Sequence, residues 1–501
     1  MGQASPVDGA GTYRLTLKSS MVYNSDGRDR NSSEQNLHEC CGVFGVYCPD
    51  EDVARLTFFA LFALQHRGQE SSGIAVADGK RMQMAGDMGL VSQVFNEEKL
   101  SHLSGHIAIG HNRYSTRGSS RVVNVQPIVL GHGPATIALA HNGNVINAEH
   151  IHEELTGQGY SFRTSTDTEV IGNLIISSPQ KEWVDKIRYA MRRLQGAYSM
   201  CLLTNDSLFA VRDPWGVRPL CLGSMNGGYV VASESCALDH IGAHFIREVE
   251  PGEIVRIRGG KIDSFQEDAH RKSLCIFEYI YFARPDSVIN GKLLYPVRQA
   301  MGAGLHDEHP VEADMVMGVP DSATAAGIGY ARHAGIPFSE GLLKNRYMGR
   351  TFIEPDQRIR DLGVRLKFNP LPQMLEGKRL IVVDDSIVRG TTTPKVVNLL
   401  RRAGVKEIHM RICAPPIRYP CFLGVDMATR HELIASRMTV EEIRKFIGAD
   451  SLGYLSVDGL LKAVGLPREV FCMACFVGDY PIPVQLEMDK LGLEAPVPRR
   501  E

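Results

Sequence analysis

Two adjacent carboxylates, Asp384 and Asp385, follow the apolar run 380–383 and precede a loop of small residues at 390–393. A strand that ends in this way delivers both acids to the edge of an open α/β sheet where ligands bind. Paired acids suit ribose hydroxyls or a hydrated Mg²⁺ ion, and the loop with its following helix N-terminus suits a phosphate. The simpler alternative is a strand–turn–helix whose acids are only solvated. The combined pattern favours a phosphate-binding site beside ribose or Mg²⁺.

The segment 382–394 closely resembles the phosphoribosyl-diphosphate loop of type I phosphoribosyltransferases. The segment 318–322 resembles the pyrophosphate loop of that family, and 344–350 resembles its flexible closing loop. Displacing diphosphate from a sugar carbon separates charge, so such a site acts by positioning the partners and stabilising that charge. The resemblance implies that Mg²⁺ is held by Ser322, Asp384 and Asp385, and that Lys344, Arg346 and Arg350 neutralise the departing diphosphate. It assigns the binding of phosphoribosyl diphosphate to Asp321, Ser322, Lys344, Arg346, Arg350, Asp384, Asp385, Ser386, Arg389, Gly390, Thr391, Thr392 and Thr393.

A second set of reactive residues begins at Cys41, which opens the sequence Cys-Gly-Val-Phe-Gly. A free thiol is mostly protonated at neutral pH and needs a neighbouring base before it can act as a nucleophile. If Cys41 becomes the first residue of the mature chain, its own α-amine, with a pKa of about 7.7–8.0, can serve as that base.

The segments 41–45, 65–73, 110–116 and 141–144 together resemble class II, or N-terminal nucleophile, glutamine amidotransferases. The resemblance implies that Asn142 and the backbone N–H of Gly143 form an oxyanion hole. It further implies that Arg113 and Asp167 bind the carboxylate and ammonium of glutamine, and that Arg67 helps to close the glutamine pocket. We expect the histidines in these segments to support loops rather than transfer protons: His66, His111 and His141.

The exact start of the mature chain is a point where this sequence departs from the family pattern. That pattern reads Glu-Cys-Gly-Val-Phe-Gly, with cleavage after Glu, whereas this chain reads Glu39-Cys40-Cys41-Gly42. We place the nucleophile at Cys41, because it directly precedes Gly-Val-Phe-Gly, and expect Cys40 to leave with a propeptide. The alternative is cleavage before Cys40, which would displace the α-amine that acts as base. The preceding segment is long, so Met21 is a second candidate for the true start.

Cys472 and Cys475 form a CxxC pair, whose spacing lets both thiolates face one metal centre. Alone, the pair could equally be redox-active or bind zinc. The family resemblance adds Cys275 and Cys421, and four thiolates suit a [4Fe–4S] cluster that clamps the domain junction. Zinc is the rival metal, since it accepts the same ligands. We expect the cysteines in apolar or strand-like contexts to be buried structural thiols: Cys48, Cys201, Cys221, Cys236 and Cys413.

The order of the predicted strands and helices that position these residues differs between the two parts of the chain. Before residue 270, we predict strands at 41–47, 107–110 and 198–203 and a helix at 53–66. A capping box from Thr166 to Glu169 predicts the start of a second helix. A third helix is predicted from the apolar face 184–194, with Gly196 just past its end. Strand runs separated by two consecutive helices predict an α+β layered domain.

After about residue 285, strands and helices alternate. We predict strands at 314–318, 379–384 and 407–413, a helix ending near Gly335, and a helix at 394–403 closed by Gly404. This alternation predicts a parallel, doubly wound sheet. We therefore divide the chain into a disordered propeptide at 1–40, an amidotransferase domain at 41–270, a phosphoribosyltransferase domain at 271–460 and a C-terminal extension at 461–501.

Composition limits the class of protein. A chain of 501 residues is too long for one core and predicts roughly two to four domains. The 55 basic and 57 acidic residues leave a net charge of −2, which argues against a nucleic-acid-binding or membrane-surface protein. No apolar run approaches the length of a membrane helix. Eleven cysteines are too few and odd in number for a secreted disulfide framework, and residues 1–40 match neither a signal nor a transit peptide. We expect a cytoplasmic protein.

Taken together, the motifs resemble those of the amidophosphoribosyltransferase family, in its propeptide-containing iron–sulfur form. The resemblance implies an N-terminal nucleophile layered sandwich joined to a type I phosphoribosyltransferase domain, with one Mg²⁺ ion and one [4Fe–4S] cluster per subunit. It implies that glutamine is hydrolysed and that the ammonia passes internally to 5-phosphoribosyl 1-diphosphate, giving 5-phosphoribosylamine, diphosphate and glutamate. This is the first step of de novo purine synthesis. The resemblance also implies a homotetramer or homodimer that purine nucleotides inhibit.

Two other classes of protein deserve comparison. A non-catalytic sensor of phosphoribosyl diphosphate would have lost its catalytic residues, and it would be expected to carry a basic DNA-binding face. Here the nucleophile, the oxyanion donors and both acids are present. Glucosamine-phosphate and asparagine synthases share the first domain but lack the loop at 382–394, so that loop excludes them.

Overall fold

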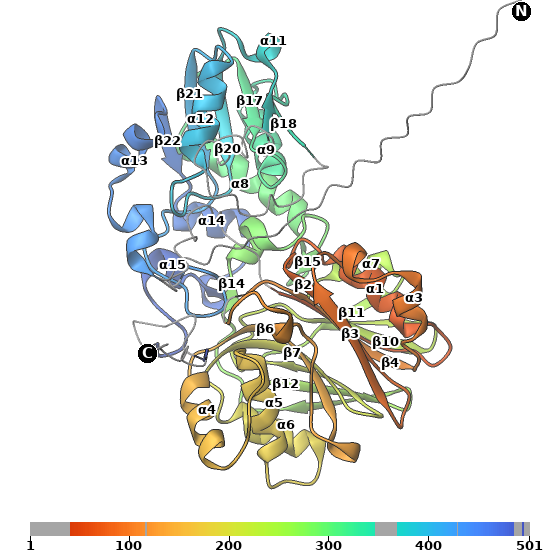
Figure 1. Ribbon diagram of the computed structural model, residues 1–501. Coiled ribbons are helices and arrows are strands. Elements are labelled where there is room, and N and C mark those ends of the chain that lie inside the picture. The colour runs from red at the N-terminus through yellow and green to blue at the C-terminus, as the bar shows by residue number, and fades with distance from the viewer. Residues whose placement is uncertain (1–40, 116–117, 346–367, 428, 485–492, 495–501) are drawn as a thin grey trace, which may run out of the picture.

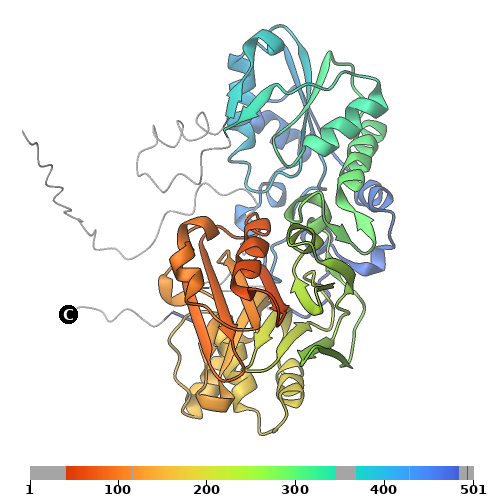
Figure 2. The same ribbon diagram turned by 90° about the vertical axis from the view of Figure 1, so that its right-hand side faces the viewer.

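The computed structural model describes residues 41–115, 118–345, 368–427, 429–484 and 493–494. These residues form two lobes, one above the other in Figure 1 and again distinct after a quarter turn in Figure 2. The predicted propeptide, with Cys40, lies outside the described residues, and so do Arg346 and Arg350.

The lower lobe is built on two antiparallel sheets. The first sheet has seven strands, in the order β11 (His244–Glu248), β9 (Cys221–Met225), β10 (Gly228–Ala232), β1 (Gly42–Tyr47), β4 (Ile107–Arg113), β2 (Ser71–Ala77) and β3 (Met82–Met88). The second has six, in the order β13 (Lys261–Gln266), β12 (Glu253–Arg258), β8 (Leu208–Arg212), β7 (Gly196–Leu203), β6 (Ile137–Val145) and β5 (Ile128–Leu130). The predicted strand at 41–47 is β1, and all six of its residues are buried.

The two sheets face each other and helices cover their outer faces. One apolar core, which includes Val43, Ile109 and Ala210, joins side chains from both sheets. The outer face of the first sheet packs on α1 (Val53–Ala63) and α7 (Ser235–His240), with α2 (Val91–Val94) and α3 (Glu97–Ser101) beside them. The outer face of the second packs on α4 (Ala148–Gly157), α5 (Asp167–Ser177) and α6 (Trp183–Met191). The lobe is thus the predicted layered sandwich.

Two local predictions need correction. The hydroxyl of Thr166 caps α5 by accepting from the N–H of Glu169, but the Glu169 carboxylate instead accepts from the N–H groups of Arg163 and Thr164. The capping box is therefore only half formed. The helix predicted to run to residue 194 ends at Met191, and Gly196 opens strand β7 with a φ of 138° rather than closing the helix.

The upper lobe contains the predicted parallel sheet, with strands in the order β17 (Met315–Gly318), β20 (Arg379–Asp384), β21 (Glu407–Ile412) and β22 (Ser451–Tyr454). Side chains of β20 alternate between its faces, as the period of a strand requires. Ile381 and Val383 pack in the core with α8 (Leu294–Glu308), α9 (Thr324–Ala334) and α14 (Val457–Val464). Leu380 and Val382 pack with α12 (Thr393–Arg402) and α13 (Val440–Ile447). Helices on both faces confirm the doubly wound α/β prediction.

The junction between the lobes is made of short elements. A π-helical turn at Glu278–Phe282 follows strand β14 (Leu274–Cys275), which pairs in parallel with β23 (Phe471–Cys472). Other short elements of the chain include β15 (Val288–Ile289), β16 (Lys292–Leu293) and α15 (Ala474–Val477), and, in the upper lobe, β18 (Leu342–Lys344), β19 (Phe368–Pro370) and α11 (Pro372–Leu375). One apolar core unites Ala197 and Val217 of the lower lobe with Phe277 and residues of the upper lobe, so the lobes share packed side chains.

Candidate active sites

A cavity of about 280 Å³ lies at the carboxyl ends of β17 and β20, where an open α/β sheet binds its ligands. Most predicted phosphoribosyl-diphosphate residues line it: Asp321, Ser322, Lys344, Asp384, Asp385, Ser386, Arg389, Gly390, Thr391, Thr392 and Thr393. His66 of the lower lobe lines the same cavity, next to the segment 281–285 at the junction. The cavity therefore has walls from both lobes.

The predicted Mg²⁺ ligands are gathered at one point of this cavity. The Ser322 hydroxyl donates to Oδ2 of Asp385 at 2.6 Å, and the Ser386 hydroxyl donates to Oδ1 of Asp385 at 2.6 Å. Burial raises the pKa of the Asp385 carboxyl, while these hydroxyls and the nearby Arg298 guanidinium act against that rise. Two adjacent acids with a hydroxyl form the oxygen-rich donor set that Mg²⁺ prefers.

The loop between β20 and α12 turns sharply at a glycine. Gly390 has a φ of 73°, and an added Cβ there would lie 2.5 Å from Cδ1 of Ile434. Pro394 stands in the first turn of α12, as predicted, where its missing N–H leaves no partner unsatisfied. The N–H groups at the start of a helix favour an anion.

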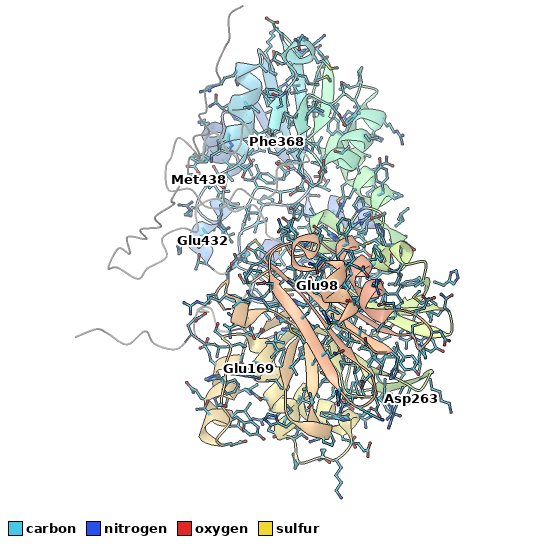
Figure 3. All side chains as sticks on the ribbon, turned by 45° about the vertical axis from the view of Figure 1, so that its right-hand side comes forward. Glu98, Glu169, Asp263, Phe368, Glu432 and Met438 are labelled. Carbon is cyan, nitrogen blue, oxygen red and sulfur yellow. The ribbon has the colours of Figure 1, made fainter. Side chains whose placement is uncertain are left out.

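Charged side chains at the rim of the cavity are already paired. Lys344 Nζ lies 2.7 Å from Oδ2 of Asp321, and Arg389 donates through Nη2 to Glu432 at 2.7 Å. Figure 3 labels Glu432 in the region between the lobes, below Phe368 of the cavity wall. A bound diphosphate would compete with Asp321 for Lys344.

Cys41 lies immediately before β1, and only 7% of its surface is exposed. Its thiol donates to the carbonyl oxygen of Tyr114 at 3.2 Å. Burial raises the pKa of Cys41 to about 11, although the contact with Tyr114 and the charge of Arg113 act against the rise. With this pKa the thiol is protonated at neutral pH, so it would need a base in order to act as a nucleophile.

The predicted glutamine ligands lie near this thiol, since the charges of both Arg113 and Asp167 act on it. Arg113 forms an ion pair with Glu70 and donates through Nη1 to the carbonyl oxygen of Ser119 at 3.3 Å. Oδ2 of Asp167 accepts from the N–H of Val145 at 3.0 Å. The two residues offer charges of opposite sign, as the carboxylate and ammonium of an amino acid require.

The predicted oxyanion donors stand in β6. Among the described residues, Nδ2 of Asn142 is buried without a hydrogen-bond partner. A buried donor without a partner is costly unless a ligand supplies the acceptor. Gly143 has a φ of 151°, and an added Cβ would lie 2.0 Å from the carbonyl oxygen of Ala197, so only glycine fits. The unpartnered amide of Asn142 suits a site for developing negative charge.

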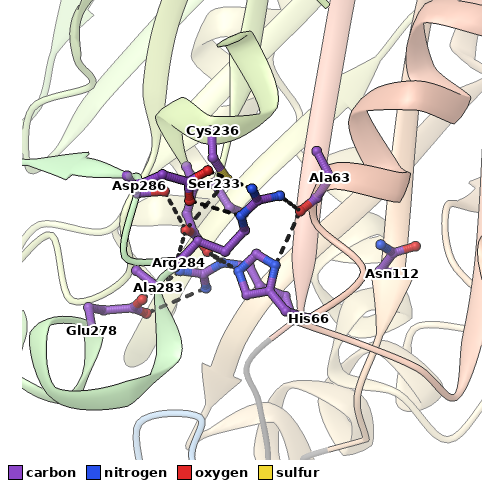
Figure 4. Close-up of polar contacts among 12 residues, drawn as sticks. Ala63, His66, Asn112, Ser233, Cys236, Glu278, Ala283, Arg284 and Asp286 are labelled. Carbon is purple, nitrogen blue, oxygen red and sulfur yellow. Dashed lines mark hydrogen bonds and ion pairs between the residues drawn. The ribbon is translucent and has the colours of Figure 1, made fainter. Parts of the chain in front are cut away.

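A buried ionic network lies at the lobe junction, where Figure 4 labels His66 and Glu278. Arg67 belongs to this network. Its Nε contacts Glu234 and its Nη2 lies 2.5 Å from Oε2 of Glu278. His66 places Nε2 at 2.6 Å from Oε1 of Glu234, and Nδ1 at 3.2 Å from the carbonyl oxygen of Ala63. Burial acts to raise the pKa of Glu234, but Arg67 and His66 hold it well below its ordinary value. These contacts direct the Arg67 guanidinium to the junction.

The segment 421–427 connects the upper lobe to the amidotransferase site. The carbonyl oxygen of Phe422 accepts from Nδ2 of Asn144 at 2.8 Å, and that of Leu423 accepts from Nη2 of Arg218 at 2.8 Å. The Tyr114 hydroxyl donates to Oδ2 of Asp426 at 3.2 Å. Because the backbone of Tyr114 contacts Cys41, this one residue links the segment 421–427 to the predicted nucleophile.

The four cysteines predicted to bind a cluster come together at the junction. Cys275 and Cys472 are register partners in the β14–β23 pair. Cys475 lies close enough to the other three thiols for their charges to raise its pKa. Burial raises the pKa of Cys275 to about 11 and those of Cys472 and Cys475 further. Among the described residues, no group of three or more His, Cys, Asp or Glu side chains could hold a metal ion. The other five cysteines named above are buried, as predicted: Cys48, Cys201, Cys221, Cys236 and Cys413.

The sequence did not reveal several residues at these sites. His66 lines the phosphoribosyl cavity, whereas it was expected only to support a loop. Glu234 and Glu278 lie in segments without a recognisable motif. The signal that could have drawn attention to Glu278 is its place in an otherwise apolar run at 276–282, where a carboxylate needs a buried partner.

Comparisons with known proteins agree with this geometry. Residues 111–240 match the model of the glutamine amidotransferase domain family, and residues 298–415 match that of the phosphoribosyl transferase domain family. An amidophosphoribosyltransferase of Synechococcus elongatus is 49% identical over 465 residues, covering 91% of this chain and 94% of that protein. An amidophosphoribosyltransferase of Methanocaldococcus jannaschii is 48% identical over 466 residues, covering 89% of this chain and 98% of that protein.

Solved structures give the same result. A glutamine phosphoribosylpyrophosphate amidotransferase from B. subtilis, complexed with ADP and GMP, superposes with a TM-score of 0.86 at 45% identity, covering 91% of this chain and 100% of that one. A structure described as the allosteric regulatory enzyme of purine biosynthesis has the same TM-score and identity, and the match covers 92% of this chain and 100% of that one. The chain therefore belongs to the amidophosphoribosyltransferase family of purine-biosynthesis enzymes.

Proposed function

We propose that the two sites act in sequence, with glutamine hydrolysed beside Cys41 and the released ammonia used in the phosphoribosyl cavity. The observation that carries this proposal is the position of the segment 65–67. His66 lines the phosphoribosyl cavity, while an added Cβ at Gly42, next to the nucleophile, would lie 3.4 Å from Cβ of Arg67. A single short segment thus borders both sites, which suits transfer of ammonia inside the protein.

In the first site, the Cys41 sulfur attacks the side-chain carbonyl carbon of glutamine. Ammonia leaves, and water then hydrolyses the thioester to glutamate. Nδ2 of Asn142 and the N–H of Gly143 would stabilise the oxyanion, and Arg113 and Asp167 would hold the glutamine backbone. Because burial raises the pKa of Cys41 to about 11, the thiol needs the α-amine that cleavage before Cys41 would create. We therefore propose that a propeptide is removed at this position.

In the second site, the nitrogen of ammonia attacks C1 of 5-phosphoribosyl 1-diphosphate as the bond from C1 to the diphosphate oxygen breaks. The products are 5-phosphoribosylamine and diphosphate. The loop 390–393 would hold the 5-phosphate, and Lys344 would exchange Asp321 for the departing diphosphate. Asp384, Asp385 and Ser322 would hold one Mg²⁺ ion, which neutralises charge on the diphosphate when bound.

We propose that the four junction cysteines hold a [4Fe–4S] cluster as a structural clamp. The charges of Cys275, Cys472 and Cys421 all act on Cys475, which supports one shared centre for the four thiols. Four thiolates suit such a cluster, and zinc accepts the same ligands.

The wider setting of the enzyme is also part of the proposal. A relative from B. subtilis was solved with ADP and GMP, which supports inhibition of this chain by purine nucleotides. A homotetramer or homodimer in the cytoplasm remains our expectation from the family. No helix among the described residues has the length and hydropathy to span a membrane. The relatives and structures described above include no non-catalytic sensor.

Replacement of the nucleophile tests the proposal. In Cys41→Ser, glutamine-dependent formation of phosphoribosylamine should fall about a thousandfold or more, because a hydroxyl replaces the thiol. The rate with ammonium chloride in place of glutamine should stay within about twofold, because the second site is intact. Cys40→Ser is the matched control, and it should keep both activities and mature to a chain that begins at Cys41. If Cys40→Ser instead abolishes the glutamine-dependent rate, the nucleophile is Cys40.

A further inference from the structure

The C-terminal part of the chain returns to the lower lobe at Leu493 and Glu494. Leu493 packs against the apolar core formed by α4, α5, α6 and the second sheet. Oε1 of Glu494 accepts from the N–H of Ser119 at 2.9 Å and from the hydroxyl of Ser165 at 2.7 Å. These partners lie 375 and 329 residues earlier in the sequence. The contact joins the end of the chain to the amidotransferase site.

Ser119 and Ser165 each lie beside a residue proposed to bind glutamine. The carbonyl oxygen of Ser119 accepts from Nη1 of Arg113, the residue proposed to bind the glutamine carboxylate. Ser165 stands two residues before Asp167, which is proposed to bind the ammonium, and directly before the cap residue Thr166. A single carboxylate therefore bridges Ser119, whose carbonyl oxygen contacts Arg113, and Ser165, which lies two residues before Asp167.

Ser119 and Ser165 are also linked to each other through Asn124. Nδ2 of Asn124 donates to the carbonyl oxygen of Ser119 at 2.8 Å and to the hydroxyl of Ser165 at 2.9 Å. An added Cβ at Gly118 would lie 2.8 Å from the carbonyl oxygen of Ser165. Asn124 supplies neutral hydrogen bonds to this bridge, whereas Glu494 supplies a charged acceptor, and charge-assisted bonds are the stronger kind.

The carboxylate is ionised in this position. Burial acts to raise the pKa of Glu494, but the hydrogen bonds from Ser119 and Ser165 lower it overall. Oε2 lies 4.0 Å from Nη1 of Arg121, a side chain that is 68% exposed and so adds little. The hydrogen bonds from Ser119 and Ser165 are therefore the main contacts of the Glu494 carboxylate.

We propose that Glu494 is a positioning residue for glutamine, which fixes Arg113 and Asp167 at their mutual distance through Ser119 and Ser165. The proposal rests on the glutamine site proposed above. It places a determinant of glutamine affinity at the end of the phosphoribosyltransferase half of the chain. Glu494 acts on binding of glutamine and leaves the chemistry at C1 of the sugar unaffected.

The test compares Glu494→Gln with Glu153→Gln, a control at an exposed glutamate of α4 in the same lobe. The amide keeps the size of the side chain but loses its charge. In Glu494→Gln, the KM for glutamine should rise about tenfold, as expected for lost charge-assisted bonds. The ammonia-dependent rate in the same preparation should equal that of the parent. Ser165→Ala, which removes one partner, should raise the KM for glutamine in the same direction.

Three results would overturn the inference. An unchanged KM for glutamine in both variants means that the bridge is irrelevant to binding. A lowered KM means that the carboxylate competes with glutamine rather than orienting its ligands. An equal fall in the glutamine- and ammonia-dependent rates means a general structural role. Arg113→Lys separates failure of the inference from failure of the glutamine site. If Arg113→Lys leaves the KM for glutamine unchanged, the glutamine site itself is wrong. If Arg113→Lys raises this KM and Glu494→Gln does not, only the bridge is rejected.

Discussion

At the scale of single residues, the carboxylate of Glu234 connects the two sites, because it contacts His66 of the phosphoribosyl cavity and Arg67 beside the nucleophile strand. Its second oxygen accepts from the N–H of Arg284 at 2.8 Å and from the hydroxyl of Ser287 at 2.6 Å. Through His66 and Arg67, the network therefore links the wall of the cavity to the segment that packs beside Gly42.

Removing the negative charge of Glu234 should be costly. In Glu234→Gln, we expect the free energy of unfolding at neutral pH to fall by about 3–5 kcal/mol, because Arg67 loses one of its two buried carboxylates. Urea unfolding followed by circular dichroism measures this loss. The control is Glu97→Gln on the surface, where Glu97 is 75% exposed in its pair with Arg55 and should matter by less than about 1 kcal/mol. Equal losses in the two variants would contradict the argument.

The same variant gives a pH test. The folded-state pKa of Glu234 lies below its unfolded value of about 4.3, so its stabilising effect is fully present above that pH. The effect is lost as the pH falls from there toward the folded-state pKa. The stability gap between the parent and Glu234→Gln should thus be constant near neutral pH and narrow below about pH 4. A gap that widens on acidification would show that the carboxylate is not held ionised.

At the scale of elements, the loop between β20 and α12 depends on its glycine. Gly390 and Gly377 have nearly the same backbone, with φ of 73° and 72°, but an added Cβ meets Ile434 only at Gly390 and meets nothing within 4 Å at Gly377. Alanine at either position should lower stability by about 1 kcal/mol through the left-handed backbone. Only Gly390→Ala should also raise the KM for phosphoribosyl diphosphate, about tenfold, because the loop or Ile434 must shift.

Ammonia-dependent assays over a range of phosphoribosyl diphosphate concentrations give this KM without involving the glutamine site. Thermal unfolding of both variants gives the backbone cost. If Gly377→Ala raises the KM as much as Gly390→Ala does, the effect comes from general loosening and not from the phosphate loop.

The elements themselves could be predicted from local pattern. The apolar run at 380–383 and the glycines at 335 and 404 fixed the strands and helix ends of the upper lobe closely, because period and capping are local properties. Local pattern failed at Gly196, where a glycine of positive φ begins a strand. It also failed for the pairing of Arg67 with Glu234 and Glu278, which lie 167 and 211 residues away. Such contacts depend on how distant segments of the chain pack together, which no local period records.

At the scale of the whole molecule, the segment 421–427 carries the proposed cluster ligand Cys421 at one end and Asp426, which contacts Tyr114, near the other. Between them, the carbonyl oxygens of Phe422 and Leu423 accept from side chains of the lower lobe. A metal centre that fixes Cys421 would therefore fix a wall of the amidotransferase site, although it takes no part in the chemistry. The proposed clamp and the proposed glutaminase are mechanically linked.

Cys421→Ser tests this link. We expect the variant to lose iron and the broad absorbance near 400 nm that a cluster gives, since one of four ligands is replaced by a weak one. The glutamine-dependent rate should fall by about tenfold more than the ammonia-dependent rate, because Asn144 and Arg218 lose a fixed partner at the first site. Cys48→Ser, at a buried thiol outside the four, should keep both the iron and the ratio of the two rates. If Cys421→Ser loses its iron and both rates fall in equal proportion, the clamp supports the lobes as a whole and not the amidotransferase wall. If Cys421→Ser keeps its iron, Cys421 is not one of the ligands.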